Sequence, residues 1–167
     1  RSVLEDGAPT IDFAVLEGIP ILGICYGQQL MALKLGGQVE NASHKEYGHR
    51  ALVASPEHPH SLVAEMASTQ VWMSHGDSIK SIGKKFELIA GSDSIEVAAY
   101  RSKQNVFGNQ VYALQFHPEV YHSTEGQKIL SNFLFDVCQC QHKWTAASFV
   151  EETVKNLQKQ IRSEDTR

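Results

Sequence analysis

Near the start of the chain, the apolar residues fall into two runs with different spacing. Residues 20–24 are almost continuously apolar, which is typical of a buried strand in a parallel sheet. Residues 26–35 carry apolar side chains at spacings compatible with a helix, and the glycine pair at 36–37 supplies a left-handed stop. We therefore predict a strand and then a helix, with Cys25 at the turn between them.

The middle of the chain alternates short apolar runs with clusters of glycine, proline, aspartate and serine. Runs of this kind predict β-strands joined by turns. The predicted strands are residues 51–54, 70–74, 86–90, 95–100 and 111–116. This part of the chain is therefore expected to be rich in strands.

Two stretches near the C-terminus have the pattern of amphipathic helices. Thr124 to Gln127 has the form of a capping box, and the apolar residues after it fall on one helical face. A second capping box, Ser148 to Glu151, opens a helix with a regular apolar stripe. A polar hinge separates the two helices, so we predict a domain boundary near Gln141.

The composition is that of a globular protein. The chain has 167 residues, of which 42% are hydrophobic and 20% charged; this suits one domain and excludes disordered, collagen-like and coiled-coil classes. Its formal net charge of -4 gives no electrostatic reason to bind nucleic acid or an anionic membrane. No apolar run resembles a membrane span or a signal peptide, so we expect a soluble, cytoplasmic protein without nucleic-acid or membrane partners.

The sequence Gly23-Ile-Cys-Tyr-Gly27 has the form of a nucleophile elbow, which presents a reactive side chain on a tight turn between a strand and a helix. The two glycines are expected to relieve crowding of the backbone around Cys25. The partial positive charge at the start of the helix is expected to lower the pKa of the Cys25 thiol. The alternative is a small buried cysteine in a core strand, which the flanking glycines disfavour.

A base for this thiol is available at His117, directly after the predicted strand at residues 111–116. In an extended backbone His117 and Glu119 project to the same side, and Pro118 stiffens the link between them. Open parallel sheets gather functional residues at the carboxyl ends of their strands, where we place both Cys25 and His117. A nucleophile, a base and an orienting carboxylate are the groups that covalent catalysis needs.

Two other clusters contain residues that can bind a substrate or a metal ion. His75 and Asp77 lie where a predicted strand ends in a tight polar turn, which suits a pocket wall whose carboxylate receives a substrate ammonium group. Cys138, Cys140 and His142 lack the four-ligand spacing of zinc modules, so no metal site is expected there.

The elbow and the His117-Pro-Glu119 triplet together resemble the signature of the class I, triad-type glutamine amidotransferases. Within that family, three further stretches resemble the glutamine-hydrolysing GMP synthases. They are residues 46–48, 74–77 and 117–133. The resemblance implies an α/β fold with an open mixed sheet flanked by helices.

The resemblance also implies roles for single residues. Cys25 is expected to be the nucleophile, His117 the general acid and base, and Glu119 the residue that orients and stabilises the imidazolium. The backbone N–H of Tyr26 is expected in the oxyanion hole. The residues expected to line the glutamine pocket are Gln29, Ser74 and Asp77. No cofactor is implied for this domain.

The resemblance further implies that the chain is part of a longer protein. Residues 1–140 are expected to be an amidotransferase domain whose first strands are missing from this chain, and residues 141–167 a linker and the start of a synthetase domain. That ATP pyrophosphatase domain, with ATP and magnesium, is expected to convert XMP to GMP in purine biosynthesis, using ammonia from glutamine. The full-length protein is expected to be a homodimer.

Three other functions remain open. Another triad-type amidotransferase, serving anthranilate, carbamoyl phosphate or CTP synthesis, shares the elbow and the histidine triplet. A stand-alone cysteine hydrolase related to γ-glutamyl hydrolase has no need of a linker helix to a partner domain. An inactive domain that only binds a partner keeps the motifs without the catalysis.

Overall fold

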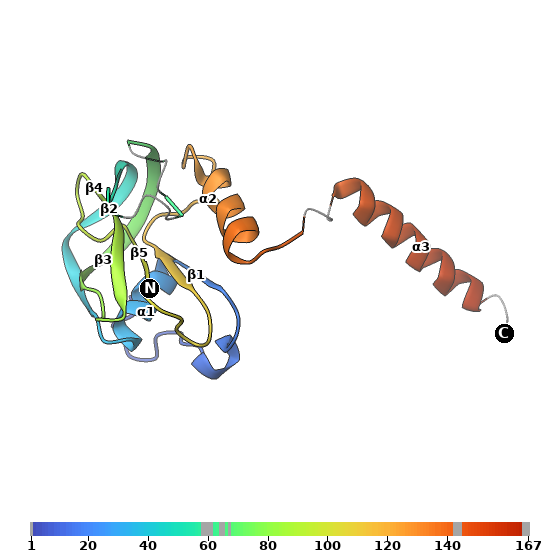
Figure 1. Ribbon diagram of the computed structural model, residues 1–167, viewed down its shortest axis with the longest axis horizontal. Coiled ribbons are helices and arrows are strands. Elements are labelled where there is room, and N and C mark those ends of the chain that lie inside the picture. Colours follow the sequence, from blue (N-terminus) through green and yellow to red (C-terminus); the bar gives the residue numbers. More distant parts are fainter. Residues whose placement is uncertain (1, 58–61, 64–65, 67, 142–144, 165–167) are drawn as a thin grey trace.

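The computed structural model describes residues 2–57, 62–63, 66, 68–141 and 145–164. Its strands and helices are shown in Figure 1. In chain order the elements are a 3₁₀ turn (Phe13–Leu16), β1 (Ile21–Ile24), α1 (Tyr26–Lys34), β2 (Gln38–Ala54), β3 (Gln70–Ser81), β4 (Phe86–Ser92), β5 (Ala99–Ser102), β6 (Val111–Leu114), α2 (Gly126–Asn132), a π-helical turn (Phe133–Val137) and α3 (Ala146–Glu164).

Within the described residues, the strands form one six-stranded sheet in the order β1-β6-β5-β4-β2-β3. β1 and β6 run parallel, whereas the other neighbouring pairs are antiparallel. In the parallel pair Ile24 lies opposite Leu114, so both strands end at the same edge of the sheet. The sheet is therefore open and mixed, as predicted.

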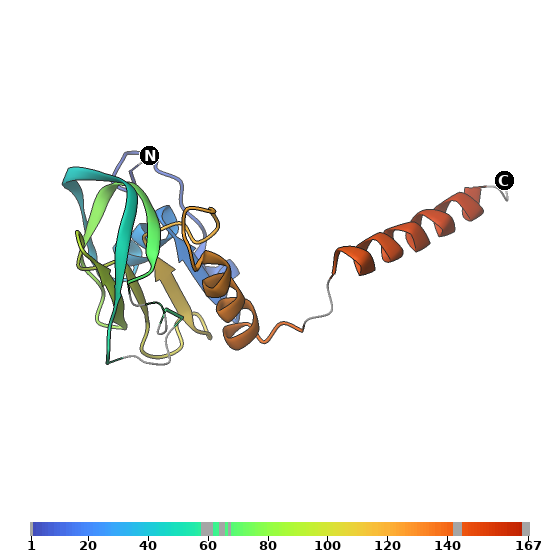
Figure 2. The ribbon, with the colours of Figure 1, turned by 90° about the horizontal axis from the view of Figure 1, so that it is seen from above.

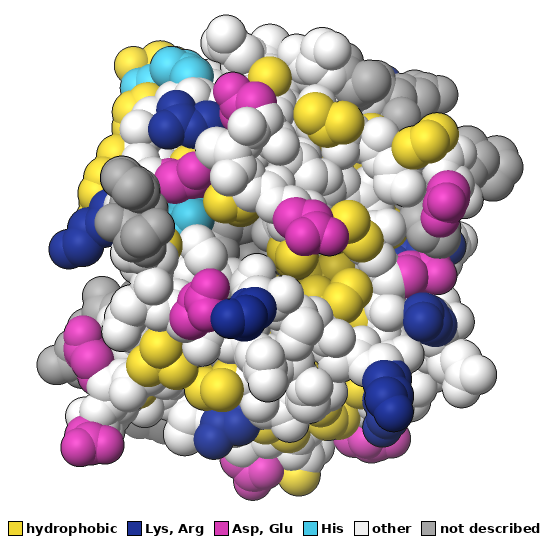
Figure 3. All heavy atoms as spheres, turned by 90° about the vertical axis from the view of Figure 1, so that its left-hand side faces the viewer, with side chains coloured by type: hydrophobic (Ala, Val, Ile, Leu, Met, Phe, Trp, Pro, Cys, Tyr) yellow, Lys and Arg dark blue, Asp and Glu magenta, His cyan; other side chains and the backbone are white. Residues whose placement is uncertain are grey.

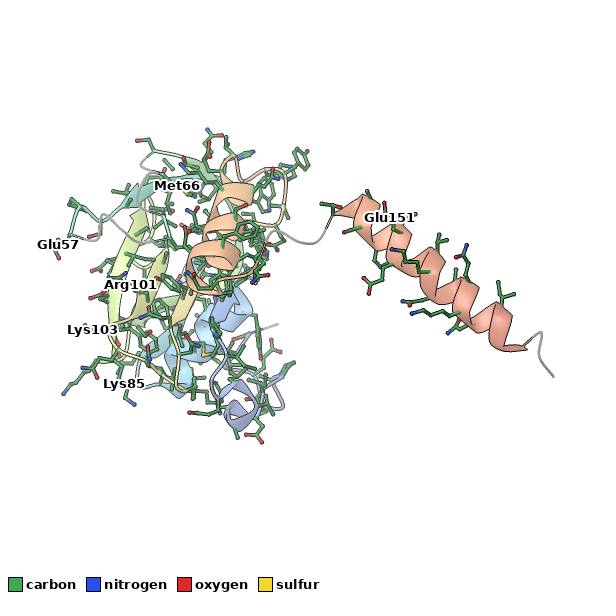
Figure 4. All side chains as sticks on the ribbon, turned by 45° about the vertical axis from the view of Figure 1, so that its right-hand side comes forward. Glu57, Met66, Lys85, Arg101, Lys103 and Glu151 are labelled. Atoms are coloured by element: carbon green, nitrogen blue, oxygen red, sulfur yellow. The ribbon has the colours of Figure 1, made fainter. Side chains whose placement is uncertain are left out.

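Two hydrophobic clusters cover opposite faces of this sheet, because successive side chains of a strand alternate between the faces. Leu114 of β6 packs in one cluster with Ile129 of α2, and Met66 of the same cluster lies beside α2 (Figure 4). Ala113, the neighbour of Leu114, packs in the other cluster with Met31 of α1. The two helices thus flank the sheet, which confirms the predicted α/β class.

Several strands differ in extent from the sequence prediction. The predicted strand 51–54 is only the end of β2, and the predicted strand 70–74 is only the beginning of β3. In the predicted strand 95–100, residues 95–98 are irregular, and β5 begins at Ala99. Hydrophobic periodicity underestimates β2 because its first half is polar and is held by antiparallel pairing with β3.

Both predicted capping boxes are wrong in position. α2 begins after Glu125, whose side chain makes no capping hydrogen bond, and Thr124 lies before it. At α3, the backbone N–H of Thr145 donates to the Ser148 hydroxyl at 2.9 Å, and the backbone N–H of Ser148 donates to the Thr145 hydroxyl at 3.0 Å. This reciprocal pair closes the first turn, so α3 begins earlier than the Ser148 to Glu151 pattern predicts.

α3 projects away from the sheet and from the other helices, in both Figure 1 and Figure 2. Its larger apolar side chains are exposed. They are Phe149, Val150, Val154, Leu157 and Ile161. Among the described residues, no helix combines the length and the apolar character that crossing a membrane requires.

Acidic and basic side chains are mixed over the face shown in Figure 3, with apolar side chains between them. This face therefore presents no extended region of a single charge of the kind that attracts nucleic acid. The small formal net charge of -4 agrees with such mixing.

Candidate active site

Cys25 occupies a strained turn between β1 and α1. Its φ of 49° and ψ of -101° lie outside the regions that side-chain-bearing residues usually adopt. Its backbone N–H donates to the carbonyl of Leu114 at 2.7 Å, which ties the turn to the end of β6. A methyl group added to Gly23 would lie 3.1 Å from the carbonyl carbon of Gly27, so a side chain at this position would crowd the backbone of Gly27.

The second glycine of the elbow does not have the steric role that the sequence suggests. A methyl group added to Gly27 meets no atom within 4 Å. The reason is that Gly27 borders an open apolar groove beside β1 and α1. The expectation that both glycines relieve crowding is therefore correct for Gly23 and wrong for Gly27.

The thiol of Cys25 is half-buried. Burial raises its pKa, the hydrogen bond from the Tyr26 backbone N–H acts in the opposite direction, and the charge of Glu119 raises the pKa further. The expectation that the start of α1 lowers the pKa of Cys25 is therefore wrong, because the effect of burial is larger and raises this pKa. The thiol donates to the backbone carbonyl of Ser74, with Sγ and oxygen 3.6 Å apart.

His117 and Glu119 lie in a turn after β6, which ends at Leu114 rather than at residue 116. Nδ1 of His117 lies 2.6 Å from Oε1 of Glu119, so the two meet across a turn and not along an extended backbone as expected. The backbone of His117 is fixed on both sides. Its N–H donates to the carbonyl of Trp72 at 3.0 Å, and its carbonyl accepts from the Ser123 hydroxyl at 2.6 Å.

One cavity of about 580 Å³ brings most of the predicted site residues together. The predicted residues that line it are Cys25, Tyr26, Gln29, Ser74, His75, Asp77 and His117. Glu119 is not among its lining residues and holds the His117 ring from outside. Cys25 and His117 both belong to the described part of the chain, and both line this space. No hydrogen bond joins Sγ of Cys25 to the His117 ring.

The side chain of Gln29 is almost fully buried and bonded to protein groups. Its Nε2 donates to the backbone carbonyl of Asp77 at 2.9 Å and to Oε1 of Gln115 at 3.1 Å. Nε2 of Gln115 lies 3.8 Å from Sγ of Cys25. Gln115 is not among the residues predicted from the sequence, and its position two residues before His117 is the only signal that could have pointed to it.

A second buried pair, not predicted from the sequence, lies beside the cavity wall. Glu46 and His75 lie opposite each other on β2 and β3. Nδ1 of His75 lies 2.8 Å from the Asp77 carbonyl and therefore carries a hydrogen. Nε2 of His75 lies 3.3 Å from Oε2 of Glu46, at ion-pair distance but without hydrogen-bond geometry. His75 and Asp77 therefore lie within β3, and the tight turn expected at this point is wrong, because pairing with β2 extends the strand to Ser81.

The described residues contain no group of three or more His, Cys, Asp or Glu side chains that could hold a metal ion. His142, one of the three residues weighed as a zinc pattern, lies outside the described residues.

The sequence has many relatives among known proteins. Residues 3–137 match the family Glutamine amidotransferase class-I. The chain is 45% identical over 161 residues to a glutamine-hydrolysing GMP synthase of Brachyspira hyodysenteriae, covering 96% of this chain and 30% of that protein. For the GMP synthase of a Synechococcus species, the identity is 43% over 162 residues, with 96% and 29% covered. The chain thus spans about 30% of the length of these relatives.

Solved structures agree with this match. A protein from Thermoplasma acidophilum, described as one subunit of a GMP synthase, superposes with a TM-score of 0.63 at 35% identity, covering 71% of this chain and 57% of that one. A glutamine amidotransferase from Thermotoga maritima shares the fold, with a TM-score of 0.51 at 22% identity over 71% and 49% of the two chains. The family match includes both the Cys25 turn and the His117 turn. The chain therefore belongs to the class I glutamine amidotransferase family.

Proposed function

We propose that this chain is the glutamine-hydrolysing part of a GMP synthase. The observation that carries the proposal is the shared cavity, in which Cys25 on its strained turn faces the same space as His117, whose ring is held by Glu119. The similarity to glutamine-hydrolysing GMP synthases favours this branch over amidotransferases that serve other products.

In the proposed reaction, His117 takes the proton of Cys25, and the thiolate attacks the side-chain amide carbon of glutamine. The backbone N–H of Tyr26 donates to the oxyanion that forms. As the C–N bond breaks, His117 gives its proton to the leaving nitrogen, ammonia departs and a γ-glutamyl thioester remains on Cys25. Water then gives a proton to His117 and attacks the thioester carbon. The C–S bond breaks, glutamate is released, and His117 returns the proton to the sulfur of Cys25. Glu119 stabilises the imidazolium in both halves.

The proposed reaction requires a change from the resting arrangement. The hydrogen of the Cys25 thiol is directed to the Ser74 carbonyl, and burial favours the protonated form. The hydrogen has to turn towards His117 before attack. We propose that substrate glutamine promotes this turn when its amino and carboxylate groups bind among Gln29, Ser74 and Asp77. The carboxylate of Asp77, on the cavity wall, suits the ammonium group of glutamine.

We propose residues 1–140 as the amidotransferase domain and residues 141–167 as the linker and start of a synthetase domain. The family match ends at residue 137, and α3 projects away from the sheet with an exposed apolar face; both observations support this division. The synthetase domain uses ATP, magnesium and the ammonia to convert XMP to GMP, in a full-length homodimer. The proposed location is the cytoplasm, where the three free thiols stay reduced.

The test is ammonia release from glutamine by the full chain and by two alanine variants. Cys25→Ala removes the proposed nucleophile, and Cys138→Ala removes a free thiol outside the cavity as a matched control. We expect hydrolysis by the parent and by Cys138→Ala, none by Cys25→Ala, and a covalent adduct on Cys25 with an electrophilic glutamine analogue. Hydrolysis by Cys25→Ala at the parental rate, or a folded parent that forms neither ammonia nor adduct, contradicts the proposal.

A further inference from the structure

A row of buried amide groups connects the cavity wall to the nucleophile. It runs from the backbone carbonyl of Asp77 to the side chain of Gln29, from there to Gln115, and from Gln115 to Sγ of Cys25. Gln29 and Gln115 are 3% and 1% exposed, so bulk water does not compete for these hydrogen bonds. Buried polar groups of this kind are costly unless they are paired, which makes the row a specific arrangement.

The first member of the row fixes the direction of the others. The carbonyl of Asp77 can only accept, so the Gln29 atom that meets it is the NH₂ group. The same NH₂ group meets the near atom of the Gln115 amide, which must therefore be oxygen. The remaining atom of the Gln115 amide is a donor, and it faces the sulfur of Cys25 at 3.8 Å. A flipped Gln115 amide would set two donors against each other.

The sulfur of Cys25 has different partners in its two protonation states. The thiol donates to the carbonyl of Ser74, whereas a thiolate gains nothing from that oxygen. The N–H of Gln115 can only donate, and hydrogen bonds to an ionised acceptor are stronger than those to a neutral one. Gln115 therefore favours the thiolate, in the same sense as the backbone N–H of Tyr26 and against the effect of burial.

We propose that Gln115 is a positioning residue that orients Sγ of Cys25 and stabilises its thiolate through the donated N–H, with Gln29 locking the direction of that donor. The inference rests on the proposed function, in which the thiolate of Cys25 is the nucleophile. Gln115 stands two residues before His117, so the donor to the sulfur and the base come from the same turn. Gln29 thereby acts on the nucleophile as well as bordering the cavity.

The sharpest test changes one atom of Gln115. Gln115→Glu keeps the side-chain length and the oxygen that accepts from Gln29, but puts an oxygen in place of the donor that faces the sulfur. Gln115→Met removes both ends of the amide at similar volume. Gln28→Met is the matched control, because Gln28 is fully buried beside Gln29 on α1 and donates to the Ala98 carbonyl, not to the sulfur.

The readout is the rate at which iodoacetamide alkylates Cys25 across a pH series, followed by mass spectrometry of the peptide that carries it. Alkylation reports the thiolate. We expect both Gln115 variants to react at least about tenfold more slowly at neutral pH, the effect of losing one hydrogen bond to a charged group, and to recover at higher pH. Cys138 and Cys140 serve as internal references, and their rates should not change.

The inference is overturned if both Gln115 variants keep the alkylation profile of the parent. It is also overturned if Gln28→Met shifts the profile as much as the Gln115 variants do, because such a shift would be an effect of packing. Thermal unfolding shows which variants are folded; if Gln115→Met is not, Gln115→Glu decides alone. Alkylation uses no glutamine, so the two proposals fail separately. If the Gln115 variants shift the alkylation profile but the parent does not hydrolyse glutamine, the role of Gln115 stands and the proposed function is rejected. If the parent hydrolyses glutamine but the profiles do not shift, the proposed function stands and the role of Gln115 is rejected.

Discussion

Glu119 holds the ring of His117 from outside the cavity, with Oε1 and Nδ1 2.6 Å apart. Glu119→Gln keeps an oxygen that can accept this hydrogen bond but removes the charge that stabilises the imidazolium. We expect glutamine hydrolysis by the folded variant to slow by roughly 10²- to 10⁴-fold. Glu151→Gln on α3, away from the sheet in Figure 4, is the control and should match the parent. Equal rates for all three proteins would show that the ring needs no charged partner.

The raised pKa of Cys25 has a consequence for stability. A thiol whose pKa is higher in the folded state contributes stability below its ordinary value of 9.0, and this contribution is lost as the pH rises through the folded value. We therefore expect the melting temperature of the parent to fall more steeply at alkaline pH than that of Cys25→Ala. Cys140→Ala, which removes an exposed thiol, should follow the parent. Parallel curves for the parent and Cys25→Ala would contradict the prediction.

At the residue scale, the spacing of the glycines and of the His-Pro-Glu triplet predicts that Cys25 and His117 face the same cavity. This pattern does not predict the environment of the Cys25 thiol, because its hydrogen-bond partners Ser74 and Gln115 lie on β3 and directly after β6, far along the chain. The contact of Gln115 with the sulfur could not be predicted for the same reason, because no local pattern shows which way a buried amide faces. The catalytic roles of Cys25, His117 and Glu119 stay predictions.

At the scale of elements, α2 packs directly behind the turn that carries His117. A methyl group on Gly126, the first residue of α2, would overlap the backbone oxygen of Pro118 and lie 2.9 Å from its carbonyl carbon. We expect Gly126→Ala to lower the free energy of unfolding by about 1–3 kcal/mol, the usual cost of overpacking, and to impair glutamine hydrolysis. Chemical denaturation checks the first effect, with Gly27→Ala as the control in open space. A parental midpoint for Gly126→Ala would mean that α2 shifts without strain.

Element types follow from the sequence more readily than element limits. The apolar run of β1 and the helical spacing of α1 are local signals, and both elements lie where they are predicted. The polar half of β2 becomes a strand only through its partner β3, which places Glu46 opposite His75. At α3, Thr145 and Ser148 both have side chains that suit a cap, and only the hydrogen bonds between them show where the helix begins.

For the whole molecule, α3 lies apart from the sheet, so the apolar face of α3 is expected to contribute nothing to the stability of the sheet. Val154 and Leu157 are 46% and 52% exposed. We expect a double variant, Val154→Ser with Leu157→Ser, to leave the unfolding free energy of the sheet and its helices within about 0.5 kcal/mol of the parent. Tryptophan fluorescence during denaturation, measured in a Trp144→Phe background so that it reports Trp72, follows this part of the chain. A larger loss would show that α3 packs on the sheet in solution.

The pairing of β1 with β6 also determines when the cavity can form during synthesis. Cys25 and Gln115 are 90 positions apart along the chain, and every strand from β2 to β6 lies between them. The ribosome therefore releases the thiol well before it makes the strand that seats it. Closing so long a segment costs entropy that only the finished sheet offsets, so long-range pairings of this kind form slowly. A nascent chain therefore exposes the Cys25 thiol to solvent until β6 has been made, and the cavity can form only in the last stage of folding.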